Sequence, residues 1–360
     1  MNPGRPGAPD NVPPVPTKRP PRRTRKSPLL ERVAAFLREL KEDAPEPESQ
    51  YIREMIVSAV RLLEDRTSLA DLKLLNASMR ELRYAFRLFA GFRGVRKVTT
   101  FGSARTVPGH ADYEQARRFA RRISEEGFMV ITGAGSGIMR ACQEGAGRDR
   151  SFGVNIRLPF EQLANEFIAG DPKLVNFKYF FTRKLLFVKE ADAITFFPGG
   201  FGTHDEAYES LTLVQTGKSL LVPLVFIDSP GGTFWKDWRS GVVERLLERA
   251  FICEEDLALF RITDDAEDAV RDICGFYRVY HSSRYVGDRL VLRLTRDPEP
   301  ELIERLNDEF GDILARGRFT QCSALPEERG DDTESLPRIV FHFNRVNFGR
   351  LRRLIDSINR

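Results

Sequence analysis

Short apolar segments alternate with amphipathic segments along residues 97–283. This alternation restricts the folds that the chain can adopt more than any other feature of the sequence. Between and after the apolar segments, apolar residues recur at helical spacing. Alternating strands and helices with uniformly apolar strands indicate a parallel sheet that helices cover on both faces. We therefore expect an α/β fold, a doubly wound, Rossmann-like parallel sheet. Its predicted strands lie within residues 97–103, 128–137, 151–159, 193–200 and 219–228.

Three predicted strands end in glycine-containing turns, TFGSAR, TGAGSG and FPGGFGT. In such sheets ligands bind outside the carboxyl ends of the strands, so we expect the three turns to meet at one ligand-binding edge. Taken alone, TGAGSG is equally well explained as a structural turn. FPGGFGT is stronger, because Gly199, Gly200 and Gly202 leave backbone N–H groups open to an anion. Thr203 supplies a hydroxyl and a cap for the helix that follows.

Charged residues accompany the third turn. Asp205 and Glu206 are neighbours on a predicted helix and point about 100° apart, so only one of them can face a ligand. For Asp205, complementing the helix dipole is the favoured role. On the preceding, otherwise apolar helix, Arg183 offers a planar fork suited to a phosphate, a ribose hydroxyl or Glu206, whereas Lys184 can snorkel to solvent. His204 is expected to be a solvated residue of the first helical turn.

Composition argues against several other kinds of protein. The four cysteines lie far apart without a CxxC pair, which argues against a zinc site or a disulfide framework and fits a reduced cytoplasm. No apolar run reaches the ~18 residues of a membrane span, and the chain does not begin with a signal sequence. We expect a cytoplasmic protein without membrane association, metal or cofactor.

Changes in composition and in hydrophobic pattern divide the chain into four predicted regions. Residues 1–27 carry a net charge of +6, against +4 for the whole chain, and are predicted to be a disordered basic tail. Nucleic-acid contact is one interpretation of this tail, and a solubilising leader is the favoured one. Residues 28–94 are expected to form helices and residues 95–283 the Rossmann-like domain. Residues 284–360 are expected to form a small ferredoxin-like α+β appendage in the order β-α-β-β-α, of a kind that binds small effectors or builds dimers.

Together the motifs resemble the LOG family, which is named for cytokinin-activating phosphoribohydrolases and is often labelled lysine decarboxylase. PGGFGTHDE fits the pattern PGGxGTxxE, and TRK lies on the preceding helix. FGSAR, TGAGSGIM, GVNIRLPFEQ and LTLVQTGK extend the resemblance over roughly residues 97–240. It is strongest to larger bacterial members that act as nucleotide nucleosidases. The resemblance implies hydrolysis of a nucleoside 5′-monophosphate to free base and ribose 5-phosphate by a homo-oligomer.

The family pattern also implies roles for particular residues. Glu206 would stabilise an oxocarbenium-like centre and activate water. Arg183, the second catalytic residue, would bind substrate and orient that carboxylate. The turn reads TGAGSG where the family has a TGGGPG-like form, a departure that can shift base preference. Phosphate contacts are implied for Gly199, Gly200, Gly202 and Thr203, and ribose or base contacts for Ser103, Arg105, Gly135, Met139 and Asn155.

Two other functions compete with the nucleosidase. A decarboxylase needs a lysine that forms a Schiff base with pyridoxal phosphate. Lys184 is the only lysine near the motif, and it is already accounted for as the neighbour of Arg183, so we reject that function. A non-catalytic nucleotide-sensing module, whose C-terminal appendage transmits the ligand state, stays the alternative. The sequence leaves open the base preference, a cytokinin nucleotide as substrate, and any small-molecule effector of the appendage.

Overall fold

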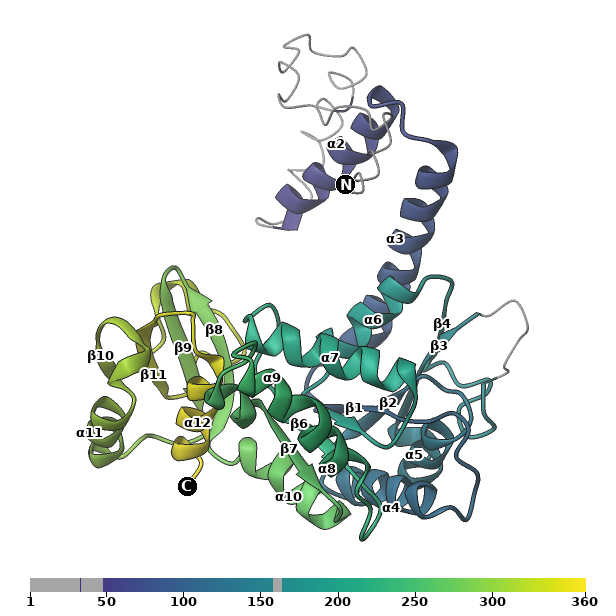
Figure 1. Ribbon diagram of the computed structural model, residues 1–360. Helices are drawn as coiled ribbons and strands as arrows, with labels where there is room; N and C mark the ends of the chain where they lie inside the picture. The colour runs from purple at the N-terminus through teal and green to yellow at the C-terminus, as the bar shows by residue number, and fades with distance from the viewer. Residues whose placement is uncertain (1–32, 34–47, 158–163) are drawn as a thin grey trace, which may run out of the picture. The chain divides into compact units, whose positions relative to one another are not determined.

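The computed structural model describes residue 33 and residues 48–157 and 164–360, and the chain divides into two compact units, residues 1–76 and 77–360. In the first unit, α2 (Glu48–Glu64) and the beginning of α3 (Leu69–Ala90) are helical (Figure 1). Ser68 begins α3, because its hydroxyl accepts a hydrogen bond from the Asp71 amide at 3.1 Å. The predicted basic tail, almost all of the first predicted helix and part of GVNIRLPFEQ lie outside the described residues.

A seven-stranded sheet forms the centre of the second unit, with the order β4-β3-β2-β1-β5-β6-β7. Every neighbouring pair is parallel. The chain builds outward from β1 to β4 and then resumes on the other side of β1 with β5, so the β1–β5 boundary is the topological switch point. The doubly wound fold predicted from the sequence is confirmed. The strands are β1 (Lys97–Phe101), β2 (Met129–Thr132), β3 (Ser151–Ile156), β4 (Leu174–Phe177), β5 (Ala193–Phe196), β6 (Leu224–Ile227) and β7 (Phe260–Thr263).

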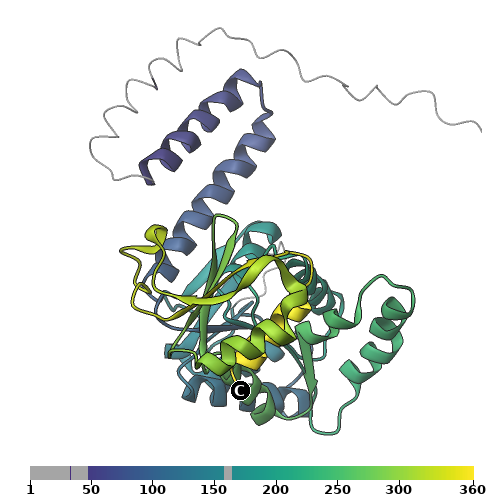
Figure 2. The same ribbon diagram turned by 90° about the vertical axis from the view of Figure 1, so that its left-hand side faces the viewer.

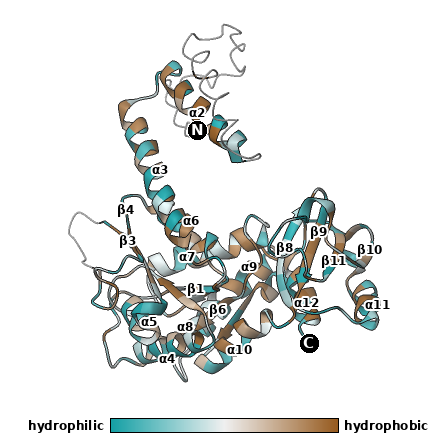
Figure 3. Cartoon of the chain, turned by 180° about the vertical axis from the view of Figure 1, so that it is seen from behind, coloured by the Kyte–Doolittle hydropathy of each residue, from teal (hydrophilic) through white to brown (hydrophobic). Residues whose placement is uncertain are grey.

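Helices cover both faces of this sheet because successive strand side chains point to opposite faces. On β2, for example, Val130 packs with α4 and α5, whereas Met129 and Ile131 pack with α3 and α6. Figure 3 shows hydrophobic residues along the central strands and both colours on the covering helices. None of the helices in the described part of the chain is long and apolar enough to span a bilayer. The helices that follow the strands of the parallel sheet along the chain are α4 (Ala111–Glu125), α5 (Ile138–Ala146), α6 (Phe180–Lys189), α7 (Phe201–Gln215), α8 (Phe234–Trp238), α9 (Glu244–Glu248) and α10 (Ala266–Phe276).

A four-stranded antiparallel sheet follows, with the order β10-β11-β9-β8. Figure 2 shows its two helices side by side on one face. The sequence pattern of residues 265–280 (DAEDAVRDICGFYRVY) predicts a single helix, and this helix is too long, because α10 ends at Phe276 and Tyr280 begins a strand. The predicted boundary at residue 284 therefore falls inside β8, and the element order is β-β-α-β-β-α. The elements are β8 (Tyr280–Val286), β9 (Arg289–Leu294), α11 (Pro300–Glu309), β10 (Leu314–Cys322), β11 (Arg338–Phe343) and α12 (Phe348–Ile358).

The last helix joins the two sheets through a shared core. Leu351, Leu354 and Ile355 of α12 belong to the same buried cluster as strand residues of the parallel sheet. The contact is close at Gly349, where an added Cβ would lie 1.9 Å from the carbonyl oxygen of Glu255.

We expect Gly349→Ala to lower the free energy of unfolding by about 1–3 kcal/mol, because the added methyl group forces α12 away from Glu255. Urea unfolding measures this change. Gly311→Ala is the matched control, since an added Cβ there would meet no atom within 4 Å. Equal stability of Gly349→Ala and wild type would contradict the close contact.

Candidate functional site

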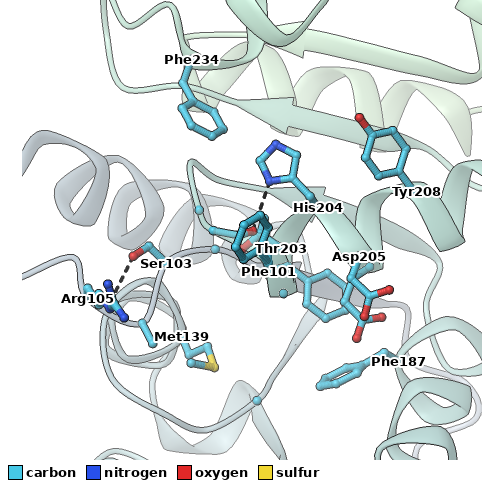
Figure 4. Close-up of a pocket in the computed structure, with 18 of the residues that line it drawn as sticks. Phe101, Ser103, Arg105, Met139, Phe187, Thr203, His204, Asp205, Tyr208 and Phe234 are labelled. Atoms are coloured by element: carbon cyan, nitrogen blue, oxygen red, sulfur yellow. Dashed lines mark hydrogen bonds between the residues drawn. The ribbon is translucent and has the colours of Figure 1, made fainter. Parts of the chain in front are cut away.

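A pocket of about 1220 Å³ opens at the carboxyl ends of β1 and β5, at the switch point of the sheet. The three glycine-containing turns all contribute to it, as expected from the sequence: residues 102–105 follow β1, Gly133 follows β2, and residues 199–200 lie between β5 and α7. Residues 201–206, at the start of α7, also line the pocket. The side walls come from α6 and α8. Figure 4 shows Ser103, Arg105 and Met139 in one part of the pocket, and His204, Tyr208 and Phe234 in another.

The turn before α7 presents open backbone to the pocket. Gly200 is the N-cap of α7, and no side-chain capping hydrogen bond is present there among the described residues, so N–H groups at the start of the helix stay without a side-chain cap. An added Cβ on Gly200 or Gly202 would meet no atom within 4 Å, which leaves room for an anion to approach. Gly199 is needed for packing instead, because its Cβ would lie 2.1 Å from the Thr203 hydroxyl oxygen.

The prediction that Thr203 caps α7 is wrong. The helix begins at Phe201, so Thr203 lies within its first turn and is buried beside Gly199. A Thr203 hydroxyl packed against the turn stabilises the shape of the cradle, and Thr203 also lines the pocket.

The turn after β1 forms the opposite rim. The Ser103 amide donates to the Pro198 carbonyl at 3.1 Å, which ties this turn to the PGG segment. The Ser103 hydroxyl accepts from the Arg105 amide at 3.1 Å (Figure 4). The exposed Arg105 side chain therefore adds positive charge at the rim, near the start of α7.

Glu206 lies at the end of the acidic run on α7, and its side chain is only 12% exposed. Burial raises the pKa of Glu206 to about 7. Lys184 opposes this shift, Glu209 and Asp205 reinforce it, and Arg183 opposes it. Near neutral pH, Glu206 is therefore poised between its protonated and ionised forms. Asp205 is mostly exposed and also lines the pocket, so the expectation that only one of the two neighbouring acids faces a ligand is not confirmed.

Arg183 is fixed between several groups of the pocket floor. Its Nε donates to the Val154 carbonyl oxygen at 2.8 Å, and its guanidinium carbon lies 5.0 Å from the centre of the Phe187 ring. Burial lowers the pKa of Arg183 to about 10, against the opposing effect of Glu206, so it stays charged at neutral pH. Gly133 provides the space, because a Cβ there would lie 2.3 Å from Arg183 Nη2.

The expectation that Lys184 snorkels to solvent is wrong. Its Nζ lies 2.8 Å from Asp205 Oδ2, 2.7 Å from Glu209 Oε2 and 3.5 Å from Glu206 Oε1. The helix that carries Arg183 and Lys184 is itself held by Glu81 of α3, whose carboxylate accepts from the Lys178 amide and the Thr182 hydroxyl, each at 2.8 Å. This anchoring fixes how α6 presents its two cations.

Two residues proposed as ribose or base contacts do not line the pocket. Asn155 pairs with its neighbour across β3 and β4, where its Nδ2 donates to Asn176 Oδ1 at 3.0 Å. Gly135 is buried, and its carbonyl accepts from Asn165 Nδ2 at 2.9 Å. Met139 lines the pocket, and its sulfur lies 2.7 Å from the position of a Cβ on Gly133.

The alanine of TGAGSG keeps a glycine-like backbone. Ala134 has a φ of 61°, a left-handed conformation that glycine adopts more easily. Its Cβ would lie 3.0 Å from a Cβ on Gly153, and its carbonyl accepts from Asn165. The methyl group thus faces β3, and Ala134 does not line the pocket, so this departure lies behind the site.

Aromatic side chains of α7 and α8 form one wall of the pocket, and this wall was not predicted from the sequence. His204 is not simply solvated: its ring centre lies 5.7 Å from that of Phe234, and its Nδ1 lies 3.1 Å from the Gly200 carbonyl oxygen. Trp238 Nε1 donates to the Tyr208 hydroxyl at 2.9 Å. Phe101 and Phe187 line another part of the pocket. The spacing of His204 and Tyr208 on one helix face was a usable signal, but the contribution of α8 required the fold.

The sequence was compared with models of known protein families. Residues 137–273 match the model of the family described as "Possible lysine decarboxylase", the label that the LOG family often carries. This match agrees with the LOG-family resemblance of the motifs, and it covers somewhat more than a third of the chain. The matched segment includes α6, the PGG turn and Glu206. No curated protein matches the chain.

Several solved structures are similar to about half of the chain. The molybdenum cofactor binding protein from Rippkaea orientalis has 19% identity over 49% of this chain and 93% of its own, with a TM-score of 0.34. The molybdenum cofactor carrier protein from Chlamydomonas reinhardtii has 16% identity over 50% and 96%, with a TM-score of 0.33. DNA processing protein A from Helicobacter pylori has 13% identity over 50% and 80%, with a TM-score of 0.30.

Proposed function

We propose that this protein hydrolyses the N-glycosidic bond of nucleoside 5′-monophosphates, releasing the base and ribose 5-phosphate. One observation carries the proposal: a single pocket holds a helix start whose N-cap, Gly200, has no side chain and, further along the same helix, the largely buried carboxylate of Glu206. Phe201 and Glu206 are five residues apart, which is about 7.5 Å along the helix axis. That separation is comparable with the span from phosphorus to anomeric carbon in ribose 5-phosphate.

The start of α7 suits the phosphate. Backbone N–H groups and the helix dipole favour an anion there, and Gly200 and Gly202 leave the approach open. Arg105 adds a positive charge at the rim. A phosphate held at this point would direct the sugar along α7 toward Glu206.

Glu206 suits the anomeric carbon. As the C1′–N bond breaks, its electron pair leaves with the base and positive charge develops on the sugar, which an ionised carboxylate stabilises. A water molecule then bonds through its oxygen to C1′, and one of its protons passes to Glu206. The departing base takes up one proton from solvent, and Glu206 returns its proton to solvent, so that the hydroxyl of water remains on C1′ and the carboxylate is regenerated. Arg183 has Nε committed to Val154, which leaves its terminal amino groups to orient substrate and carboxylate.

A chromatographic assay tests the proposal. The purified protein is incubated with AMP, GMP, CMP, UMP and isopentenyl-adenosine monophosphate, and free base and ribose 5-phosphate are quantified. We expect the two products in equal amounts, and adenosine as a control substrate to react about 10²-fold or more slowly because it lacks the phosphate. Tight nucleotide binding without release of any base would contradict hydrolysis and support the sensing module instead.

Gly133→Ala tests the placement of Arg183. The added methyl group would overlap Arg183 Nη2 and Met139 Sδ, so we expect kcat/KM for the preferred nucleotide to fall about 10²-fold with the fold intact. Gly275→Ala in α10 is the matched control, because its Cβ would meet no atom within 4 Å. Full activity of Gly133→Ala would show that Arg183 does not depend on this space.

A further inference from the structure

Lys184 follows Arg183 on α6 but differs from it in what it contacts. Arg183 lines the pocket, whereas Lys184 is not among the lining residues. The Lys184 ammonium instead lies among three carboxylates of α7, at 2.7 Å from Glu209, 2.8 Å from Asp205 and 3.5 Å from Glu206. Its side chain is 20% exposed, so these ion pairs are partly shielded from water.

The distances from the Lys184 ammonium to the three carboxylates differ, and the difference suits a residue that supports Glu206 without binding substrate. An ammonium has three N–H donors, and the two short contacts go to Asp205 and Glu209. Those two acids stand four residues apart on α7, where like charges repel, and the lysine between them offsets the repulsion. The contact with Glu206 is longer, so Lys184 exerts its charge on Glu206 while leaving the carboxylate oxygens available on the pocket side.

We propose that Lys184 is a positioning residue, which holds the Glu206 carboxylate in place and favours its ionised form from outside the substrate pocket. The catalytic consequence rests on the proposed function, but the effect on Glu206 itself does not. Lys184 thereby has a role that requires neither a Schiff base nor contact with substrate.

The charges that face Glu206 come from two helices. Arg183 and Lys184 of α6 lower its pKa, and Asp205 and Glu209 of α7 raise it, in addition to the larger effect of burial. Although burial alone would lower the pKa of Lys184, its hydrogen bonds to Asp205 and Glu209 raise it, so the lysine is charged throughout the range in which Glu206 titrates. Without Lys184, one cation would face two repelling carboxylates, and Glu206 would hold its proton to higher pH.

Direct titration of Glu206 tests the proposal without relying on turnover. The full-length protein is labelled with ¹³C at the glutamate side-chain carboxyl, and the Glu206 resonance is assigned by its loss in Glu206→Gln. Wild type is compared with Lys184→Met, which keeps the length without the charge, with Lys184→Arg, which keeps the charge, and with Glu209→Gln. Base release from the preferred nucleotide is measured over the same pH range.

We expect the Glu206 midpoint to rise by about one pH unit or more in Lys184→Met, to be largely restored in Lys184→Arg and to fall in Glu209→Gln. The acid limb of base release should move with the midpoint, lowering activity about tenfold at pH 6 in Lys184→Met. Equal midpoints in wild type and Lys184→Met would overturn the proposal. A shifted midpoint in a protein that releases no base would support the positioning role and contradict the proposed function instead.

Discussion

Glu206→Gln is expected to reduce base release about 10³-fold while nucleotide binding is largely retained. Glutamine has nearly the same shape but neither the negative charge that stabilises an oxocarbenium-like centre nor the basicity that activates water. Wild-type activity should rise with pH through about 7, where Glu206 ionises. Steady-state rates and isothermal titration calorimetry with the preferred nucleotide measure the two effects separately.

The unfolding temperature of Glu206→Gln shows whether its loss of activity comes from the missing carboxylate or from an unfolded protein. A carboxyl group whose pKa is raised in the folded state destabilises the protein as pH rises above its ordinary value, because the folded state must then hold a buried charge. The folded Glu206→Gln variant avoids that charge, so at pH 8 it should unfold at the same temperature as wild type or higher. Glu248→Gln, on an exposed position of α9, is the matched control. A Glu206→Gln protein that is fully active would remove Glu206 from the mechanism.

Glu328→Gln is expected to lower the free energy of unfolding by about 3–5 kcal/mol. Arg293 of β9 and Arg338 of β11 stand directly opposite each other in the antiparallel register, where like charges destabilise a sheet. The Glu328 carboxylate lies between them, accepting from Arg293 at 2.7 and 3.0 Å and from Arg338 at 2.8 Å. Glu328 and Arg338 are fully buried. Removing the carboxylate charge leaves two guanidinium groups poorly compensated in the interior.

The pH dependence of stability has a defined sign at this site. Burial alone would raise the pKa of Glu328, but hydrogen bonds from Arg293, the Leu325 amide and Arg338 hold it below its ordinary value. Its contribution is therefore present at neutral pH and is lost as pH falls through the folded pKa. Urea unfolding of wild type, Glu328→Gln and the exposed control Glu327→Gln at several pH values measures this. A Glu328→Gln protein as stable as wild type would contradict the role of the ion pairs.

The central strands were predictable from sequence because they are buried on both faces and consist mostly of apolar residues and threonine. The two strands that were missed, β4 and β7, form the edges of the parallel sheet. Edge strands tolerate polar residues, and Asn176 and Arg261 interrupt their apolar pattern. β8 was assigned to the preceding helix because Tyr280 continues the apolar spacing of α10, and only its pairing with β9 shows that the chain has become extended.

Those residues of the site that belong to one local sequence motif were predictable. The PGG turn and Glu206 are contiguous in sequence, and Arg183 belongs to a recognisable TRK segment. The role of Lys184 was missed because it depends on α6 packing beside α7. Asn155 was proposed as a substrate contact, but strand pairing turns its amide toward Asn176. Gly133 was expected to serve a turn, and the structure shows that it makes room for Arg183.

Hydrolysis of the N-glycosidic bond at Glu206 can be tested by identifying the products that wild type and Glu206→Gln form from AMP. Adenine is quantified by chromatography, and the phosphorus-containing product is identified by ³¹P nuclear magnetic resonance. We expect adenine and ribose 5-phosphate in a one-to-one ratio from wild type, and neither from Glu206→Gln within the same time. Adenosine with inorganic phosphate, or bound AMP that stays intact with wild type, would contradict this hydrolysis.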